Sequence, residues 1–330
     1  MKKLPKLDLN ITNRCNFHCV HCAFDSGCRK IKEFSLEKIR EILEQTKELG
    51  GKRIDITGGE PLVRKDIVEI IKIGKSLDYK IELVTNGSLL TKNKLILFKK
   101  LGLDSIAIAL DGSNYETYSR IRKVGKKIYE KVLKNIKEAI KQGFSVKINT
   151  LIVQSNLDDI PKITEFCIKN KVKEHGLYYF TPVGRGNISD ELAVEPLKWL
   201  DFIKKHLIKY QDKIKISLEF PLIEKGKLKC NIGCIAHTEK YHLQILPNGN
   251  VYPCAILASY NKPIANLFSV SIKDIWNNKK LWDGYWKELS TLFDKCGGYC
   301  VNFKQAFNIK NYRKFDFVCP LRKFHPSDVL

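Results

Sequence analysis

The sequence LDLNITNRCNFHCVHC at residues 7–22 joins a short apolar run to a loop that holds three cysteines. The apolar run predicts a β-strand. Cys15, Cys19 and Cys22 follow it at a C-x3-C-x2-C spacing. Three thiolates from one loop can bind three irons of a [4Fe-4S] cubane and leave the fourth iron open to a small-molecule ligand. A zinc site is the alternative, since His18 or His21 would complete a set of four ligands.

Short runs of apolar and β-branched residues recur along the chain, with amphipathic helical stretches between them. They cover residues 7–11, 53–57, 80–85, 105–110, 145–151 and 176–181. Strands that alternate with helices predict βα units and a parallel sheet. Because six units are too few for a closed eight-stranded barrel, we expect an α/β fold with an open, partial (β/α)6 TIM-like barrel. Its functional loops should lie at the C-terminal ends of the strands.

The stretches between the strands have the apolar spacing of helices. In the first two, the residues expected on the buried face are Leu36, Ile39, Ile42, Leu43 and Leu49, and then Ile67, Ile70, Ile71 and Gly74. Ser35 is placed to cap the first helix. Cys167 falls within a later helical pattern and is expected in the core, whereas Cys28 is expected to be a loop thiol.

Composition divides the chain into three expected parts. Residues 1–185 contain the six βα units. Residues 186–229 change to a turn rich in Gly and charge, a helix over 196–210 and an extended piece, which indicates a bridging segment. Residues 230–330 are dense in Cys, Gly, Asn and aromatic residues, which predicts a small α+β domain organised by bound metal more than by an apolar core.

Bulk composition narrows the class of protein. The hydrophobic fraction of 44% is that of a globular protein. We find no N-terminal run of signal-peptide length and no stretch near the roughly 18 apolar residues that span a bilayer, so we expect a cytoplasmic protein without a membrane partner. Eleven cysteines in that compartment favour metal or cluster ligation over disulfides. The formal net charge of +22 indicates either an anionic partner, such as RNA, a nucleotide or an acidic leader peptide, or a lysine-rich solvated surface.

The cysteine loop resembles that of the radical S-adenosylmethionine (SAM) superfamily, in which C-x3-C-x2-C follows the first strand of a partial (β/α)6 barrel. The resemblance covers residues 7–185. It implies that Cys15, Cys19 and Cys22 hold a [4Fe-4S] cluster whose open iron binds SAM. It also implies that His21, next to the last cysteine, lies beside the adenine, where relatives usually have an aromatic residue.

A second match to the superfamily lies at the ends of the second and third strands. Gly58, Gly59, Glu60 and Pro61 resemble its GGEP motif, which implies contact with the methionyl amino group through backbone carbonyls or Glu60. The glycines permit close backbone approach, and the proline stiffens the turn. Asn86 ends the third strand as in many relatives.

Later strand ends match the superfamily less completely. Asn149 stands where relatives often reach the ribose or the carboxylate, and Arg122 where an arginine often neutralises the methionine carboxylate. Ala109 is a departure, because many relatives have a serine there that contacts the cofactor. The segment TPVGRG at residues 181–186 is similar to PxGRG segments of relatives with a second cluster domain, and its glycines would allow backbone contact with adenine.

Six cysteines gather in the last hundred or so residues, which packing alone does not explain. They are Cys230, Cys234, Cys254, Cys296, Cys300 and Cys319. The segment from Cys234 to Cys254, with Gly249 between them, resembles the SPASM or twitch extension, which binds an auxiliary [4Fe-4S] cluster. The resemblance implies that Cys230, Cys234, Cys254 and Cys300 complete one such cluster, leaving Cys296 and Cys319 over.

A full SPASM domain has two more cysteines shortly before the later pair, and this chain has Lys287 and Ser290 at those positions. We therefore expect one auxiliary cluster. A second would need Asp294, His325 or another group as a substitute ligand.

The implied reaction is one-electron cleavage of SAM to methionine and a 5′-deoxyadenosyl radical, which abstracts hydrogen from an unactivated C–H bond. An auxiliary cluster suits an oxidative outcome, so we expect an oxidoreductase that modifies a peptide or protein, with a reductant such as ferredoxin or flavodoxin. Ala255 stands where sulfatase-maturing relatives have an aspartate, which argues against that activity. The alternatives are maturation of a tetrapyrrole-type cofactor, RNA modification, and a non-catalytic iron-sulfur electron carrier.

Overall fold

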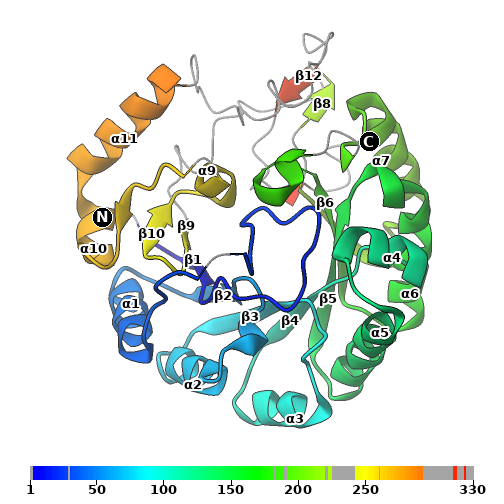
Figure 1. The fold of residues 1–330 in the computed structure, drawn as a ribbon, viewed down its shortest axis with the longest axis horizontal. Coiled ribbons are helices and arrows are strands. Elements are labelled where there is room, and N and C mark those ends of the chain that lie inside the picture. Colours follow the sequence, from blue (N-terminus) through cyan, green and yellow to red (C-terminus); the bar gives the residue numbers. More distant parts are fainter. Residues whose placement is uncertain are drawn as a thin grey trace.

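A computed structural model describes residues 3–28, 30–180, 183–188, 192–219, 222–224, 242–259, 261–292, 315–317 and 323–324. Its main element is a curved sheet with helices on the outer face (Figure 1). The strand order is β11-β10-β9-β1-β2-β3-β4-β5-β6-β7-β13. The run from β9 to β7 is parallel throughout, and antiparallel strands border it at both edges.

The six predicted strands are confirmed and pair in chain order. They are β1 (Lys6–Asn10), β2 (Arg53–Thr57), β3 (Lys80–Thr85), β4 (Ser105–Ala109), β5 (Ser145–Ile152) and β6 (Glu174–Tyr179). Two parallel strands that we did not predict extend this set, namely β7 (Lys215–Glu219) beside β6 and β9 (His242–Ile245) beside β1. The open barrel therefore recruits a strand from each of the two later parts of the chain.

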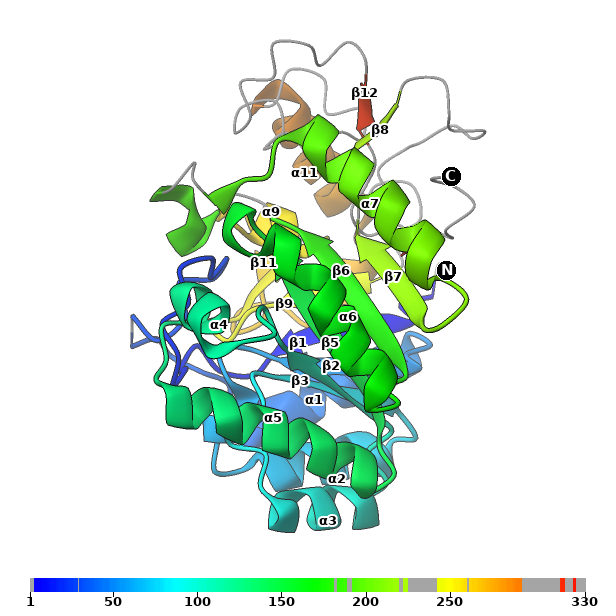
Figure 2. The same cartoon turned by 90° about the vertical axis from the view of Figure 1, so that its right-hand side faces the viewer.

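Helices cover the outer face of the parallel strands, and α5, α6 and α7 follow one another along it in Figure 2. Their bounds are α1 (Leu36–Glu48), α2 (Ile67–Ser76), α3 (Lys92–Lys100), α4 (Tyr115–Arg122), α5 (Lys126–Lys141), α6 (Ile160–Lys169) and α7 (Pro196–Tyr210). The last agrees with the helix predicted over 196–210. Ser35 caps α1 as predicted, because its side chain accepts a hydrogen bond from the Lys38 amide. Cys167 is buried in α6, also as predicted.

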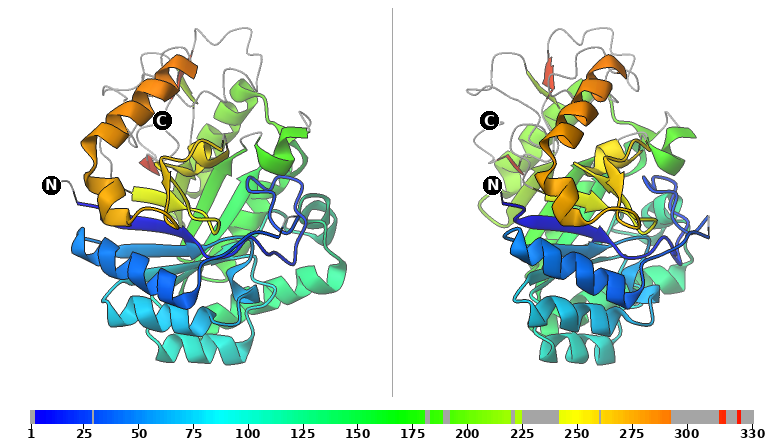
Figure 3. Two further views of the ribbon diagram at one scale, coloured as in Figure 1. Left: turned by 60° about the vertical axis from the view of Figure 1, so that its left-hand side comes forward. Right: turned by 90° about the vertical axis from the view of Figure 1, so that its left-hand side faces the viewer.

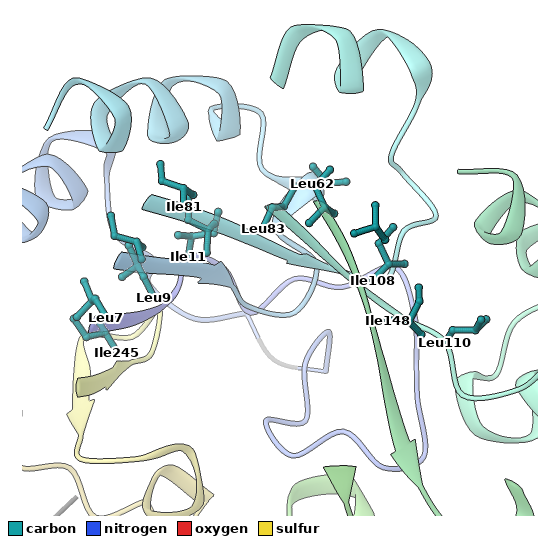
Figure 4. Close-up of a cluster of buried hydrophobic side chains, with 14 of the residues drawn as sticks. Leu7, Leu9, Ile11, Leu62, Ile81, Leu83, Ile108, Leu110, Ile148 and Ile245 are labelled. Atoms are coloured by element: carbon teal, nitrogen blue, oxygen red, sulfur yellow. The ribbon is translucent and has the colours of Figure 1, made fainter. Parts of the chain in front are cut away.

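The main apolar core lies between the strands and the outer helices. Figure 4 shows residues of this layer, including Leu7, Leu9, Ile81, Leu83 and Ile148. In β1, β2 and β5 such residues alternate with polar residues on the inner face, so these strands carry apolar side chains outward and mostly polar ones inward. Burial of the apolar set drives the fold, and the inner face remains free for charges and for a site.

The remaining elements flank the sheet. They are β8 (Leu222–Glu224), β10 (Asn250–Tyr252), α9 (Ala255–Ser259), β11 (Ala265–Asn266), α10 (Ile272–Asn277), α11 (Lys279–Leu292), β12 (Phe315–Phe317) and β13 (Lys323–Phe324). Helices α10 and α11 lie on the β1 side of the molecule (Figure 3), and α10 contacts α1. A search of the described residues finds no helix with the length and apolar character that a bilayer span requires.

Candidate functional site

A cavity of about 390 Å³ lies at the carboxyl ends of the parallel strands. Cys15, Cys19 and Cys22 all line it, together with the ends of β2 to β6. Its walls also include an aromatic and aliphatic group: Phe17, Phe24, Val84, Leu151, Tyr178, Tyr179 and Phe180. A chamber that joins three thiols to an apolar wall has the character of a ligand site, and it lies where the barrel pattern predicted one.

A buried arginine holds together the two ends of the loop that carries the cysteines. One guanidinium nitrogen of Arg64 donates to the carbonyls of Ile11 (2.8 Å) and Phe34 (3.0 Å), the residues at the two ends of the loop. Glu33 adds a second tie, since its carboxylate accepts from the Thr12 hydroxyl and the Asn13 amide. These contacts hold the two ends of the loop together, and sequence reasoning identified neither.

The cysteine loop approaches the end of β2 so closely that Gly58 and Gly59 are required there. The φ angle of Gly58 is +149°, which favours glycine, and a Cβ on Gly59 would lie 2.4 Å from the Arg14 carbonyl oxygen. The Gly59 amide donates to the Thr12 carbonyl at 2.7 Å. Both glycines line the cavity, so the motif also sets the position of the cysteine loop.

Glu60 is fully buried beneath this wall. Its carboxylate accepts hydrogen bonds from the Leu62 amide, the Thr85 hydroxyl and the Asn86 amide at 2.7 to 3.1 Å. Glu60 and Pro61 are absent from the described lining of the cavity. Glu60 therefore ties the GGEP turn to the end of β3, and its contact with a cofactor stays a prediction.

Asn86 and Asn149 both reach the cavity, at the ends of β3 and β5. The amide group of Asn86 is fixed, because it donates to the Asn16 side chain at 2.9 Å and accepts from Ser88. The side-chain Oδ1 of Asn149 accepts from the Tyr178 hydroxyl at 3.2 Å. Asn86 thus contacts the cysteine loop directly, while Asn149 contacts the end of β6.

Arg122 enters the cavity from the end of α4 and makes a buried ion pair. Its Nε donates to Asp111 at 2.5 Å, and its Nη1 lies 3.7 Å from the Cys19 Sγ. The Asp111 side chain is completely buried, and its other oxygen accepts from the Leu151 amide. The carboxylate that Arg122 neutralises in this structure is therefore Asp111, and a contact with the methionine carboxylate stays a prediction.

His21 lies in the cavity wall with one nitrogen unsatisfied. Its Nδ1 is buried and has no hydrogen-bond partner among the described residues, and its Nε2 is 3.9 Å from Asp111. Burial, with the positive charges of Arg122 and Arg185, lowers the pKa of His21 to about 4, so the ring is neutral at pH 7. A neutral ring with an unpaired nitrogen suits contact with an aromatic base, and the contact of His21 with adenine stays a prediction.

Arg185 is a residue whose role the sequence did not reveal. Its side chain donates to the carbonyls of Cys19 (2.9 Å) and Ser26 (3.1 Å) and also to Asp25 and to the Cys28 Sγ. Gly184 packs against the Cys22 and Ala23 carbonyls, where a Cβ would clash at 2.5 Å or less. This segment therefore holds the cysteine loop in place, and the contact of its backbone with adenine stays a prediction.

The predicted auxiliary ligands are described only in part. Cys254 is a buried cysteine just before α9, and the next residue, Ala255, lines the cavity. The other five predicted positions lie outside the described residues: Cys230, Cys234, Cys296, Cys300 and Cys319. The later part of the chain thus reaches the chamber of the N-terminal cysteines.

The donor set fits the predicted cluster and cofactor. Burial raises the pKa of the Cys15 thiol to about 11 and also raises that of Cys19, so ligation requires proton release. Within the described ranges, no three His, Cys, Asp or Glu side chains group closely enough to bind one metal ion. A cubane would instead take each thiol on a separate iron, and His21, whose buried Nδ1 has no partner among the described residues, lines the same cavity.

Comparisons with known families match two parts of the chain. Residues 9–167 match the radical SAM superfamily, and residues 234–301 match the SPASM iron-sulfur cluster-binding domain. An AdoMet-dependent heme synthase of Methanosarcina barkeri is 25% identical over 319 residues, which cover 90% of this chain and 89% of the relative. A probable GTP 3′,8-cyclase of Methanocaldococcus jannaschii is 37% identical over 169 residues, which cover 50% of this chain and 56% of the cyclase. The chain thus spans little more than half the length of that cyclase.

The fold is also similar to that of solved structures. Streptococcus suis SuiB bound to S-adenosylmethionine superposes with a TM-score of 0.73 at 20% identity, over 92% of this chain and 74% of SuiB. At this identity the likeness concerns the arrangement of helices and strands. It agrees with the open α/β barrel predicted from the alternation of strands and helices.

Proposed function

Because the chain belongs to the radical SAM superfamily and carries a SPASM iron-sulfur domain, we propose that this enzyme oxidatively modifies a peptide or protein. The two domains imply [4Fe-4S] clusters and SAM as its cofactors. When bound, these supply one-electron cleavage of SAM to a radical that abstracts hydrogen from the substrate. The observation that carries the proposal is the single cavity shared by Cys15, Cys19, Cys22 and Ala255.

The chain's own residues have two tasks in this scheme. Arg64, Glu33 and Arg185 fix the cysteine loop, and the Gly58-Gly59 turn lets it approach β2. The aromatic wall formed by Phe24, Tyr178, Tyr179 and Phe180 excludes water from the reacting group. Such a wall suits an uncharged side chain better than a free charged group, which supports a peptide substrate.

Cleavage of SAM tests the class of reaction. We would reconstitute the protein anaerobically, reduce it with dithionite, add SAM and measure 5′-deoxyadenosine by chromatography. The control is the triple variant C15A/C19A/C22A. Product from the wild type alone is expected. If the wild type forms no 5′-deoxyadenosine although its clusters are intact and reduced, the electron-carrier alternative is favoured.

Iron content tests the auxiliary site, for which we propose Cys230, Cys234, Cys254 and Cys300 as ligands. With one auxiliary cluster, the reconstituted chain should hold about eight irons. The C254A variant should then lose about four irons and keep the SAM-binding cluster. A wild-type content of about twelve irons would contradict this ligand set.

A second candidate is maturation of a tetrapyrrole-type cofactor, which the similarity to the AdoMet-dependent heme synthase suggests. What favours it is that this relative matches nearly the whole chain. We would incubate the reduced enzyme with SAM and either a deuterated peptide pool or a deuterated, carboxylated tetrapyrrole. Transfer of deuterium to 5′-deoxyadenosine from only one of them identifies the substrate class. If SAM is cleaved with neither, RNA is the next substrate to test.

A further inference from the structure

We propose that Arg122 raises the reduction potential of the cluster held by the N-terminal cysteines, by donating a hydrogen bond to the sulfur of Cys19. This inference rests on the proposed function, because it requires a cluster at Cys15, Cys19 and Cys22. It goes further in assigning to Arg122 an action on the protein's own ligand sulfur. Arg122 is thus a positioning and tuning residue, distinct from one that touches the substrate.

The two edges of the Arg122 guanidinium group have different partners. Nε donates to Asp111, while Nη1 lies 3.7 Å from the Cys19 Sγ, which is within the range of an N–H···S hydrogen bond. Asp111 is fixed in turn, because its second oxygen accepts from the Leu151 amide. The carboxylate therefore holds one edge of the guanidinium, and the positive edge that remains is directed at the sulfur.

The same cysteine is held from its backbone by another arginine. Arg185 donates to the Cys19 carbonyl at 2.9 Å, and the Val20 amide donates to the Ile121 carbonyl, next to Arg122 in the chain. Cys19 is also buried, whereas Cys15 and Cys22 are half-buried. The Cys19 sulfur is therefore held in a fixed position relative to its hydrogen-bond donor, Arg122.

Burial makes the interaction strong. The Arg122 side chain is 11% exposed and that of Asp111 is fully buried, so water screens this charge poorly. Reduction adds one electron from an external low-potential donor to the cluster and so adds one negative charge beside Cys19. A positive donor at the ligand sulfur stabilises the reduced state more than the oxidised one, which raises the potential.

Two roles for Arg122 make different predictions. If it pairs with the methionine carboxylate, its loss weakens SAM binding and leaves the potential of the SAM-free cluster unchanged. If it acts on the Cys19 sulfur, its loss lowers the potential before any SAM is added. The decisive measurement is therefore made on the reconstituted enzyme without SAM.

The experiment is a redox titration followed by electron paramagnetic resonance. The signal that changes when SAM is added to a parallel sample identifies the cluster with the open iron, and the auxiliary cluster serves as an internal reference. The variant is R122Q. The matched control is R120Q, which removes the same charge from an exposed position on the same helix, α4.

For R122Q we expect about a tenfold fall in the ratio of reduced to oxidised SAM-responsive cluster at a fixed potential, or about 59 mV for one electron. R120Q and the auxiliary signal should stay at their wild-type values. The D111N variant should shift the ratio in the opposite direction, because it removes the counter-charge and keeps an acceptor for Nε.

R122Q leaves Asp111 buried without its partner and could fail to fold. R122K is the second variant, because it keeps the charge that Asp111 needs and loses the planar group that reaches the sulfur. It should shift the ratio in the same direction as R122Q, by less. A SAM-free potential that is unchanged in R122K and in folded R122Q overturns the inference. Absence of any SAM-responsive cluster in the wild type would instead overturn the proposed function.

Discussion

The amino and carboxyl ends of the parallel strands both carry charged side chains on the inner face of the barrel, but with different partners. At the amino end, Lys6 pairs with Asp8 and Asp55 at 2.8 and 2.9 Å, and Arg53 pairs with Asp55 and Glu82 at 2.8 and 3.0 Å. Two of these pairs, Lys6–Asp55 and Arg53–Glu82, join neighbouring strands, and the other two lie within a single strand. At the carboxyl end, the charges hold a loop.

The difference lies in where each arginine directs its donors. Arg64, Arg122 and Arg185 each pair with one aspartate and also donate to loop carbonyls or to a cysteine sulfur. Beside them the His21 Nδ1 has no partner among the described residues. Matched charges stabilise a fold, whereas a buried polar atom left unpaired marks a place for a ligand. The amino end should therefore affect stability, and the carboxyl end cluster binding and catalysis.

The largest effect is expected from Gly59→Ala at the carboxyl end. A Cβ there would meet the Arg14 backbone at 2.4 Å, so the cysteine loop must move. We expect at least a tenfold loss of 5′-deoxyadenosine formation, since small displacements of a site have effects of about this size or larger. The control is Gly284→Ala in α11, where nothing lies within 4 Å of the new Cβ and helix propensity favours alanine by about 1 kcal/mol. Equal activity in the two variants would contradict the tight fit of the loop.

Glu174→Gln tests the amino end. Glu174, 12% exposed, pairs with Lys147 at 3.0 Å and with Lys215 at 2.6 Å, and Lys147 is itself nearly buried. Loss of the carboxylate leaves a buried charge uncompensated, so we expect the free energy of unfolding to fall by about 3 kcal/mol in urea titrations. The SAM cleavage rate per intact cluster should not change. Asp201→Asn breaks an exposed pair with Lys205 and should cost less than about 1 kcal/mol.

Low pH should weaken the same ion pairs, because it protonates Glu174. Burial alone would raise the pKa of Glu174, but Lys147 and Lys215 outweigh it and lower the pKa from 4.5 to about 2. The folded state therefore gains stability from this carboxylate above about pH 4.5 and loses it as the pH falls toward 2. Over that pH interval, we expect the unfolding free energy of the wild type to fall by roughly 1 to 2 kcal/mol more than that of Glu174→Gln. Parallel curves for the two proteins would contradict this pairing.

The strands and the cysteine loop were predictable because their signals are local. Strands β2 and β3 begin and end at the predicted residues, since each apolar run is bounded by polar residues and followed by a helix. Strand β9 was missed because its partner, β1, lies more than 230 residues earlier, and a short run does not identify its partner. Strand β7 was recognised only as an extended piece.

The sequence predicted the reactive residues of the site better than the contacts that hold these residues in place. Cys15, Cys19, Cys22, His21 and Asn86 all line one cavity, as their positions at strand ends implied. The supporting contacts were not predictable, because an arginine's sequence context does not show which carbonyls it will reach. Arg64 and Arg185 bond to backbone atoms that only the folded loop presents.

A small effect on stability, and the sharpest test of the comparison, is expected from His21→Phe. Phenylalanine keeps a ring in the cavity wall and removes the buried nitrogen that has no partner among the described residues. Removal of an unsatisfied polar atom should stabilise the cofactor-free protein by about 1 kcal/mol in urea titrations. If that nitrogen serves the cofactor, the Kd for SAM, measured by isothermal titration with the reconstituted enzyme, should rise severalfold. A stabilised variant with unchanged SAM affinity would mean that the unpaired atom has no part in binding. A destabilised variant would mean that His21, like Glu174 at the other end, supports the fold.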